Sequence, residues 1–141
     1  MAAVKHLLIL GAVFHASLCF NSTRTVKEVF DLWRDKSQNE HPECMISSGA
    51  TAEEVDEFWL NHNIDNISSS MKCYLACIMK AFKLVSPTGD FDGTEIVKAI
   101  DRITSGATEH CKKVPPEVTD ECERIYHFIR CGIHYNHELE D

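Results

Sequence analysis

The stretch at residues 71–85, MKCYLACIMKAFKLV, constrains the fold of this chain more than any other part of the sequence. Its three charged side chains are lysines, and on a helix of about 100° per residue they fall within an arc of roughly 80°. A helix that is polar on so narrow a stripe is surrounded by other parts of the protein. Cys73 and Cys77 lie four residues apart, so both thiols leave the same side of this helix. We therefore predict a central helix that two disulfides join to its neighbours.

A signal peptide is predicted at residues 1–19. An early lysine precedes an apolar run over residues 7–14, which is too short to span a membrane, and small residues close to Cys19 fit a cleavage site. A membrane anchor is the alternative. Cleavage after Cys19 leaves six of the seven cysteines in residues 20–141, which we predict to form one helical domain. An even number of cysteines in a small secreted chain indicates a disulfide framework.

The charge of the chain excludes two classes of partner. Removing Lys5 with the signal peptide leaves 13 of the 14 basic residues against 22 acidic ones, a net charge of about −9. Nucleic acids and anionic membrane surfaces repel such a chain. No stretch beyond residue 19 has the roughly eighteen apolar residues that a membrane span needs. We therefore expect a secreted, extracellular protein with no nucleic-acid partner and no stable membrane insertion.

Apolar residues at helical spacing predict four further helices. We place them at residues 23–36, from residue 51 onward, at residues 92–105 and at residues 119–131. Thr51 and Glu54 have the spacing of a capping box, in which each side chain bonds an exposed amide of the other residue. Loops are expected at residues 37–42, at residues 61–70 and around Cys111, and the tail after Cys131 leaves room for a short sixth helix. No alternating apolar and polar run indicates a strand, so the predicted class is all-α, a compact bundle of five to six helices.

Helix geometry limits which of the six cysteines can pair. Cys73 and Cys77 point in nearly the same direction from one helix, which is poor disulfide geometry. Cys122 and Cys131 lie on opposite faces of another helix and cannot reach each other. Each bonded cysteine must then reach a different element, which predicts interlocked disulfides. Because a chain of this size can usually fold without three of them, we hypothesise that an internal cavity lowers its stability.

The cysteine spacing, C-x28-C-x3-C-x33-C-x10-C-x8-C from Cys44 to Cys131, resembles that of the six-cysteine odorant-binding proteins of insects, which include the pheromone-binding proteins. The x3 and x8 gaps are the tightest part of that pattern. The central stretch described above, the Gly-Asp-Phe-Asp turn at residues 89–92 and the Asp-Glu-Cys-Glu sequence at residues 120–123 are similar as well. The resemblance covers the whole chain after the signal peptide.

This resemblance implies six helices around an internal apolar pocket, with the disulfide pairs Cys44–Cys77, Cys73–Cys122 and Cys111–Cys131. It also implies a carrier that binds small hydrophobic molecules, such as odorants or pheromones, and transports them through sensillum lymph or another secretion to an olfactory receptor. The chain departs from moth pheromone-binding proteins in its tail, which has only ten residues after Cys131. We expect this tail at most to cover the mouth of the pocket.

A carrier needs a dry pocket with adaptable side chains, and it needs no catalytic group, cofactor or metal. We predict that this pocket is lined by apolar residues of the last three predicted helices and the tail: Met71, Leu75, Ile78, Met79, Phe82, Ile96, Ile100, Ile103, Tyr126, Phe128, Ile129 and Tyr135. Ordinary core packing is the alternative for each of them. The hydroxyl of Tyr126 or Tyr135 would bond an alcohol, aldehyde or ester head group.

Two histidines in the tail, His134 and His137, lie where a lid would be, and we hypothesise that their protonation near pH 6 loosens the lid and releases the ligand. Solvated histidines without such a role are the alternative. The histidine spacing does not indicate a metal site. Asn21 and Asn66 begin N-glycosylation sequons.

The sequence contains none of the motifs of a serine hydrolase, a metalloprotease or a phosphate-binding loop, so we predict no enzymatic activity. The alternative to a carrier is a secreted, disulfide-linked helical protein of cytokine or venom type, which would act through protein contacts and have no ligand pocket. The identity of the ligand, the tissue of expression and the formation of a homodimer are left open by the sequence.

Overall fold

The structure is a computed structural model that describes residues 22–115 and 117–137. These residues form seven α-helices and no β-strand, which confirms the predicted all-α class. The helices are α1 (Val26–Glu40), α2 (Glu43–Ser48), α3 (Ala52–Trp59), α4 (Ser69–Ala81), α5 (Gly93–Ala99), α6 (Ser105–Cys111) and α7 (Glu121–His137). None of these helices is long and apolar enough to span a membrane. The predicted signal peptide and Asn21 lie outside the described residues.

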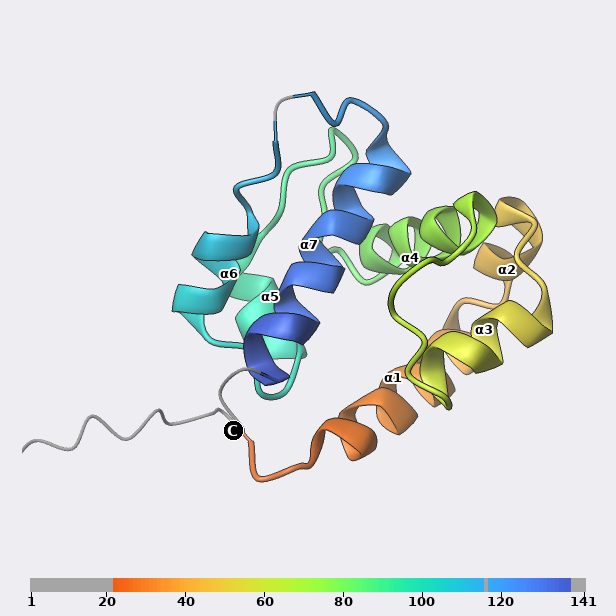
Figure 1. Cartoon of the computed structure of the whole chain (residues 1–141), viewed down its shortest axis with the longest axis horizontal. Helices are drawn as coiled ribbons and strands as arrows, with labels where there is room; N and C mark the ends of the chain where they lie inside the picture. Colours follow the sequence, from red (N-terminus) through yellow and green to blue (C-terminus); the bar gives the residue numbers. More distant parts are fainter. Residues whose placement is uncertain (1–21, 116, 138–141) are drawn as a thin grey trace, which may run out of the picture.

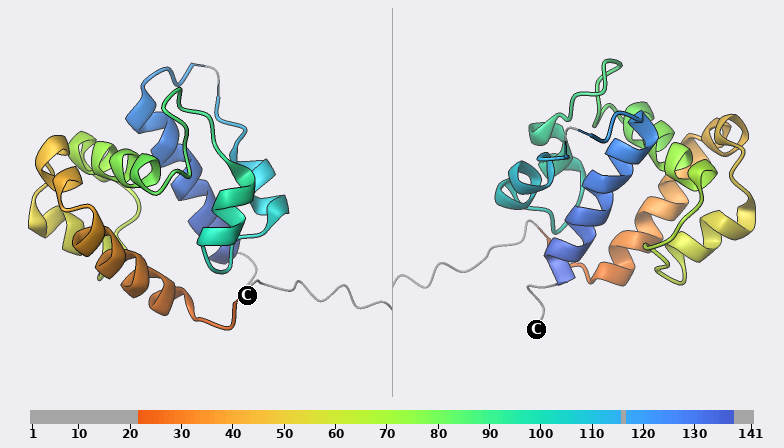
Figure 2. Two further views of the ribbon diagram at one scale, coloured as in Figure 1. Left: turned by 180° about the vertical axis from the view of Figure 1, so that it is seen from behind. Right: turned by 45° about the horizontal axis from the view of Figure 1, so that its top comes forward.

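Helix α7 lies between two groups of helices. On one side α6 packs against both α7 and α5, and on the other side α4 packs against both α7 and α2. Helix α1 packs against α3. Figure 1 and both views of Figure 2 place α1, α2, α3 and α4 together, across α7 from α5 and α6. The helices α4 and α7 therefore form the centre of the bundle.

Three disulfides hold α4 and α7 in this central position. They are Cys44–Cys77 between α2 and α4, Cys73–Cys122 between α4 and α7, and Cys111–Cys131 between α6 and α7. These are the pairs that the family resemblance implies. Each joins two different helices, and α4 carries two of them on one side, as its i,i+4 cysteines require.

The N-terminal part of the chain is more helical than predicted. Helix α1 begins after Thr25, whose hydroxyl accepts a hydrogen bond from the Glu28 N–H while the Glu28 carboxylate accepts one from the Thr25 N–H. It continues to Glu40, through residues 37–40 that we predicted as a loop, and ends just before Pro42. The polar composition of these residues does not break the helix, because the side chain of Ser37 is completely buried against the rest of the protein. The short helix α2 that carries Cys44 was also missed.

Helix α4 is shorter than its apolar pattern predicts and ends at Ala81. Lys83 has a left-handed backbone with a φ of 59°, which ends the helix. Leu84 and Val85 nevertheless stay buried, and Val85 forms a single antiparallel bridge with Phe91 across the predicted turn. Leu84 and Val85 are apolar because the core covers them, and not because they continue the helix.

The segment from Asp92 to Cys111 forms two short helices where one was predicted. The Asp92 carboxylate accepts hydrogen bonds from the N–H groups of Thr94 and Glu95 and so begins α5. After α5 ends at Ala99 the chain turns at Arg102, whose φ is 67°. The Thr104 hydroxyl then caps α6, which places Cys111 at the end of a helix and not in a loop.

Most of the tail after Cys131 is a direct continuation of α7, which runs without interruption to His137. The predicted end at Cys131 was wrong: the helix continues through Gly132, because one glycine inside a helix costs only about 1 kcal/mol. The separate sixth helix that we allowed for in the tail is therefore the last part of α7. Residues 138–141 lie outside the described residues.

Candidate functional site

An apolar cavity with a volume of about 120 Å³ lies in the core of the protein. A single water molecule needs roughly 10–15 Å³ by the same measure, so the cavity accommodates a larger molecule. The residues that line it come from α1, α3, α4, α7 and the connection between α5 and α6: Val26, Val29, Phe30, Trp33, Phe58, Trp59, Leu75, Ile78, Met79, Ile100, Asp101, Arg102, Ile103, Phe128, Ile129, Gly132 and Ile133. All but Asp101 and Arg102 are uncharged, so the cavity suits a hydrophobic molecule.

Aromatic side chains of α1 and α3 form one wall of this cavity. The rings of Phe58 and Trp59 meet edge to face with their centroids 4.9 Å apart, and Phe30 packs on both at 6.0 and 5.8 Å. Such ring contacts hold the side chains in fixed positions. We did not predict this wall, although the sequence does place these residues on the apolar faces of their helices.

The structure brings seven of the twelve predicted pocket residues to the cavity: Leu75, Ile78, Met79, Ile100, Ile103, Phe128 and Ile129. The other five lie elsewhere. Met71, Ile96 and Tyr126 are buried outside the lining. The ring of Phe82 meets the rings of Trp33 and His41, and the ring of Tyr135 lies 5.6 Å from that of His110.

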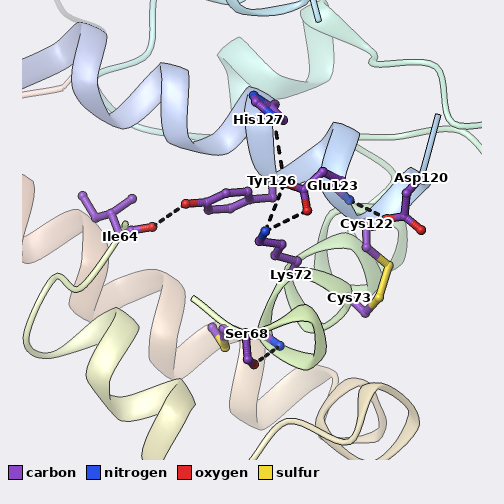
Figure 3. A network of polar contacts seen from close by, with 10 residues as sticks. Ile64, Ser68, Lys72, Cys73, Asp120, Cys122, Glu123, Tyr126 and His127 are labelled. Atoms are coloured by element: carbon purple, nitrogen blue, oxygen red, sulfur yellow. Dashed lines mark hydrogen bonds and ion pairs between the residues drawn. A yellow bond between two sulfur atoms is a disulfide. The ribbon is translucent and has the colours of Figure 1, made fainter. Parts of the chain in front are cut away.

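Tyr126 belongs to a polar network that fastens α7 to α4 and to the α3–α4 loop (Figure 3). Its hydroxyl donates a hydrogen bond to the carbonyl of Ile64 at 2.9 Å, and burial raises the pKa of its phenol. Beside it, the Lys72 ammonium bonds the Glu123 carboxylate at 2.7 Å. The hydroxyl that we proposed for a ligand head group therefore bonds the loop, and the network positions α7 against the cavity.

The charged end of the cavity lies at the connection between α5 and α6. Asp101 forms an ion pair with Arg24, which precedes α1, and an Arg102 guanidinium N–H donates to the Arg24 carbonyl at 2.9 Å. The two contacts tie the segment before α1 to the α5–α6 connection. Val26, two residues after Arg24, lines the cavity, and a Cβ atom on Gly132 of α7 would lie 3.6 Å from Ile103 of the α5–α6 connection, so α1 and α7 both contribute to this end.

The described part of the tail forms a wall of the cavity through Gly132 and Ile133, and it carries His134 to the outside. The His134 ring nitrogen Nε2 lies 3.4 Å from an Asp65 carboxylate oxygen of the α3–α4 loop. A positive charge on the His134 ring would attract this carboxylate. The contact would then hold the tail more tightly, which is the opposite of the loosening that we hypothesised. The side chain of His137 lies outside the described residues.

The contact between Asp65 and α7 is expected to persist at pH 5. The Arg130 guanidinium, 2.5 Å from Asp65, holds the pKa of this carboxyl below its usual range, and His134 acts in the same direction. A carboxyl whose pKa is lowered in the folded state stabilises that state above its unfolded pKa, near pH 4, and loses this effect as the pH falls through the lower folded value.

The variant Asp65→Asn tests whether the ionised Asp65 carboxylate stabilises the folded protein. We expect the variant to lower the thermal midpoint equally at pH 7 and at pH 5, with the difference from the parent shrinking as the pH falls below about 4, the pKa of the unfolded carboxyl. The effect is modest, because the side chains of Arg130 and Asp65 are 46% and 48% exposed. If the variant and the parent differ in thermal midpoint at pH 7 but not at pH 5, the contact between Asp65 and α7 does not persist at pH 5.

The described residues contain no group of three or more His, Cys, Asp or Glu side chains that could hold a metal ion. Asn66, which begins the second sequon, is exposed in the α3–α4 loop, with a left-handed backbone and a φ of 59°. Its position at the surface is compatible with glycosylation, which stays a prediction.

Comparison with known proteins gives one family. A model of the PBP/GOBP family matches residues 28–135. General odorant-binding protein 19d of Drosophila melanogaster is 26% identical over 125 residues, which cover 89% of this chain and 79% of that protein. No solved structure gives a significant match. The range matched by the family model contains the six bonded cysteines and every cavity-lining residue except Val26.

Proposed function

The chain belongs to the PBP/GOBP family, the odorant-binding proteins of insects, and on this premise we propose that it carries a small hydrophobic molecule in the cavity between α1, α3, α4 and α7. The family match confirms the resemblance that the cysteine spacing indicated. The observation that carries the proposal is the cavity itself, because its lining is apolar apart from Asp101 and Arg102. The alternative of a helical interaction protein with a filled core fits this interior less well.

The chemistry of the wall supports a carrier and not an enzyme. Aromatic rings on α1 and α3 and aliphatic side chains on α4 and α7 surround the cavity. Burial of apolar surface stabilises a bound chain by about 0.8 kcal/mol per methylene. For roughly ten methylenes, less the costs of association, we expect a Kd in the micromolar range or weaker. Such affinity suits a carrier that must release its ligand again.

Secretion and delivery complete the proposal. We propose that residues 1–19 act as a signal peptide and that the protein of residues 20–141 is exported, where its disulfides form in an oxidising compartment. In sensillum lymph or another secretion it would transport its ligand to a chemosensory receptor. The acidic composition supports this role, because a net charge far from zero keeps an abundant protein soluble.

The proposed function is tested by competition for a fluorescent apolar probe. The oxidised protein of residues 20–141 is titrated with the probe at pH 7, and long-chain alcohols, aldehydes, esters and hydrocarbons are then added as competitors. We expect saturable uptake of one probe per chain and displacement at micromolar concentrations. A monomer with all three disulfides that takes up no probe has a filled core, and the interaction protein would then be the better account.

A further inference from the structure

The loop between α3 and α4 presents the side chain of Asn66 to solvent. Asn66 begins the sequence Asn-Ile-Ser, an acceptor sequence for an N-linked glycan. The residue is exposed, its backbone is left-handed with a φ of 59°, and it lies outside any helix. Among the described residues its side-chain amide has no hydrogen-bond partner. The nitrogen atom to which a glycan is attached is therefore accessible and unoccupied by protein contacts.

The order of the cysteines leaves this acceptor sequence uncovered during export. Asn66 lies inside the loop that Cys44–Cys77 closes, and the other two disulfides do not enclose it. Cys77 follows Asn66 in the chain. Because a chain is synthesised and exported from its N-terminus onward, no disulfide encloses Asn66 when it first emerges.

Asn66 also lines a polar surface groove, which we call the α4–α7 groove. The other lining residues come from the same loop, from α4 and from α7: Asp65, Lys72, Glu123, Tyr126, His127 and Arg130. Figure 3 shows Lys72, Glu123, Tyr126 and His127 together at the contact of α7 with α4. None of the seven lining residues belongs to the wall of the apolar cavity. The groove is therefore a second site, separate from the cavity.

The ion pair beside Asn66 leaves hydrogen-bonding atoms unused. Arg130 bonds the Oδ1 atom of Asp65 through its Nε atom, and within the described residues its two Nη groups and the Asp65 Oδ2 atom have no partner. Both side chains are about half exposed. A guanidinium donates hydrogen bonds and a carboxylate accepts them, so the pair can bond both the carbonyl and the hydroxyl groups of a sugar. This chemistry next to Asn66 suits a carbohydrate better than a hydrophobic ligand.

We propose that Asn66 carries an N-linked glycan in the exported protein, and that the first N-acetylglucosamine of this glycan lies in the α4–α7 groove against Arg130 and Asp65. The donor is a lipid diphosphate-linked oligosaccharide. The Asn66 amide nitrogen bonds the anomeric carbon of its first sugar, the bond from that carbon to the phosphate oxygen breaks, and the lipid diphosphate and one proton are released. The proposal rests on the export proposed above and not on the carrier function.

A sugar in this place has two consequences for the protein. It adds contacts between the α3–α4 loop and α7 to the existing pair of Asp65 and Arg130, so we expect it to stabilise the fold. It also covers the groove and leaves the cavity free, so we expect the affinity for a fluorescent apolar probe to change by less than twofold.

Peptide mass spectrometry tests whether Asn66 is modified. The full chain of residues 1–141 is secreted from insect cells in the presence of a mannosidase inhibitor, which keeps N-linked glycans cleavable by endoglycosidase H. Asn21→Gln removes the other acceptor sequence. We expect most of the peptide that contains Asn66 to carry a glycan, and to retain a single N-acetylglucosamine after the endoglycosidase.

Two substitutions of Ser68 form a matched pair for this measurement. The Ser68 hydroxyl caps α4 and also completes the acceptor sequence. Ser68→Thr keeps both, and we expect it to keep the glycan. Ser68→Gly removes the acceptor sequence, and we expect the glycan to be lost while the helix stays capped, because glycine is about as good an N-cap as threonine.

Thermal unfolding tests where the sugar lies. The secreted protein, trimmed to one N-acetylglucosamine, is compared with residues 20–141 of the same variant refolded from bacteria, which carry no glycan. We expect the trimmed protein to unfold about 3 °C higher, as one additional net hydrogen bond predicts. In Arg130→Met this difference should fall to about 1 °C or less. Lys80→Met removes another ion pair between α4 and α7, outside the groove, and should leave the difference unchanged.

The possible failures separate the parts of this account. Secreted protein with three disulfides and an unmodified Asn66 would overturn the proposal, and Asn66 would then serve only its left-handed turn. A single attached sugar that leaves the thermal midpoint unchanged points into solvent, which contradicts its place in the groove. Neither result touches the carrier function, which probe binding measures separately. A chain that stays in the cytosol would contradict the proposed export and the glycan together.

Discussion

Replacing Gly132 by leucine is expected to weaken ligand binding about a hundredfold while the fold stays intact. Gly132 lies in α7 and lines the cavity, and a Cβ atom placed there would meet the Cδ1 atom of Ile103 at 3.6 Å, an ordinary contact. The four carbons of a leucine side chain would then occupy space that about four methylenes of a ligand need. At about 0.8 kcal/mol each, this loss is about 3 kcal/mol.

Two variants control this result. Gly132→Ala adds a single methyl group, so we expect the affinity to fall by at most about fourfold and the protein to become more stable by about 1 kcal/mol, because alanine favours the helix. Gly106→Leu adds the same side chain to α6 at an exposed position outside the cavity lining, and we expect it to leave binding unchanged. Probe titration and thermal unfolding of all three variants check these values. If Gly132→Leu binds ligand as tightly as the parent, the ligand occupies another site.

Loss of the Cys73–Cys122 disulfide is expected to destabilise the protein by about 4 kcal/mol. The bond joins the two central helices across 49 residues of sequence, and in the chain-entropy model a loop of this length gives about that value. The loss is a large fraction of the 5–15 kcal/mol that usually separates folded from unfolded states. The double variant Cys73→Ser with Cys122→Ser, unfolded in urea, provides the measurement.

The Cys111–Cys131 bond provides the comparison, because it spans 20 residues and is expected to contribute about 3 kcal/mol. Its removal should therefore cost less than removal of Cys73–Cys122. The reverse order, or a loss below 1 kcal/mol for Cys73–Cys122, would show that α4 and α7 stay together without their disulfide.

The central helix could be predicted from the sequence because several local signals agree there. Cysteines at i and i+4, a narrow stripe of lysines and a long apolar run all require a buried helix with bonded neighbours. The structure places it between α2 and α7, with Lys72 and Lys80 of the stripe paired to Glu123 and Glu121 of α7. The prediction was wrong only about the end of the helix, where Leu84 and Val85 are buried without being helical.

Seven of the seventeen residues that line the cavity were predicted from the sequence. Apolar patterns show that a face is buried, and they do not show which element it meets. Phe30 and Trp59 belong to faces that the sequence marks as apolar, and only the packing of α1 on α3 brings them to the cavity. Conversely, Met71 and Ile96 share those patterns and are ordinary core residues.

The burial of Ser37 had no signal in the sequence. Ser37 lies among hydrophilic residues that favour a loop, and a serine there has no feature that distinguishes a buried hydroxyl from an exposed one. Its burial follows from the extension of α1 to Glu40, which turns Ser37 toward Trp59 and Tyr74. The packing of α1 against its neighbours, and not local composition, determines whether Ser37 is buried.

Tryptophan fluorescence tests the proposed site most directly, because both tryptophans of the chain, Trp33 and Trp59, line the cavity. A long-chain alcohol that carries bromine in the middle of its chain quenches an indole only when the two are in contact. We predict saturable quenching at the Kd found by probe displacement, and its reversal by the unbrominated alcohol. If the brominated alcohol displaces the probe but leaves the tryptophan fluorescence unchanged, the ligand does not bind in this cavity.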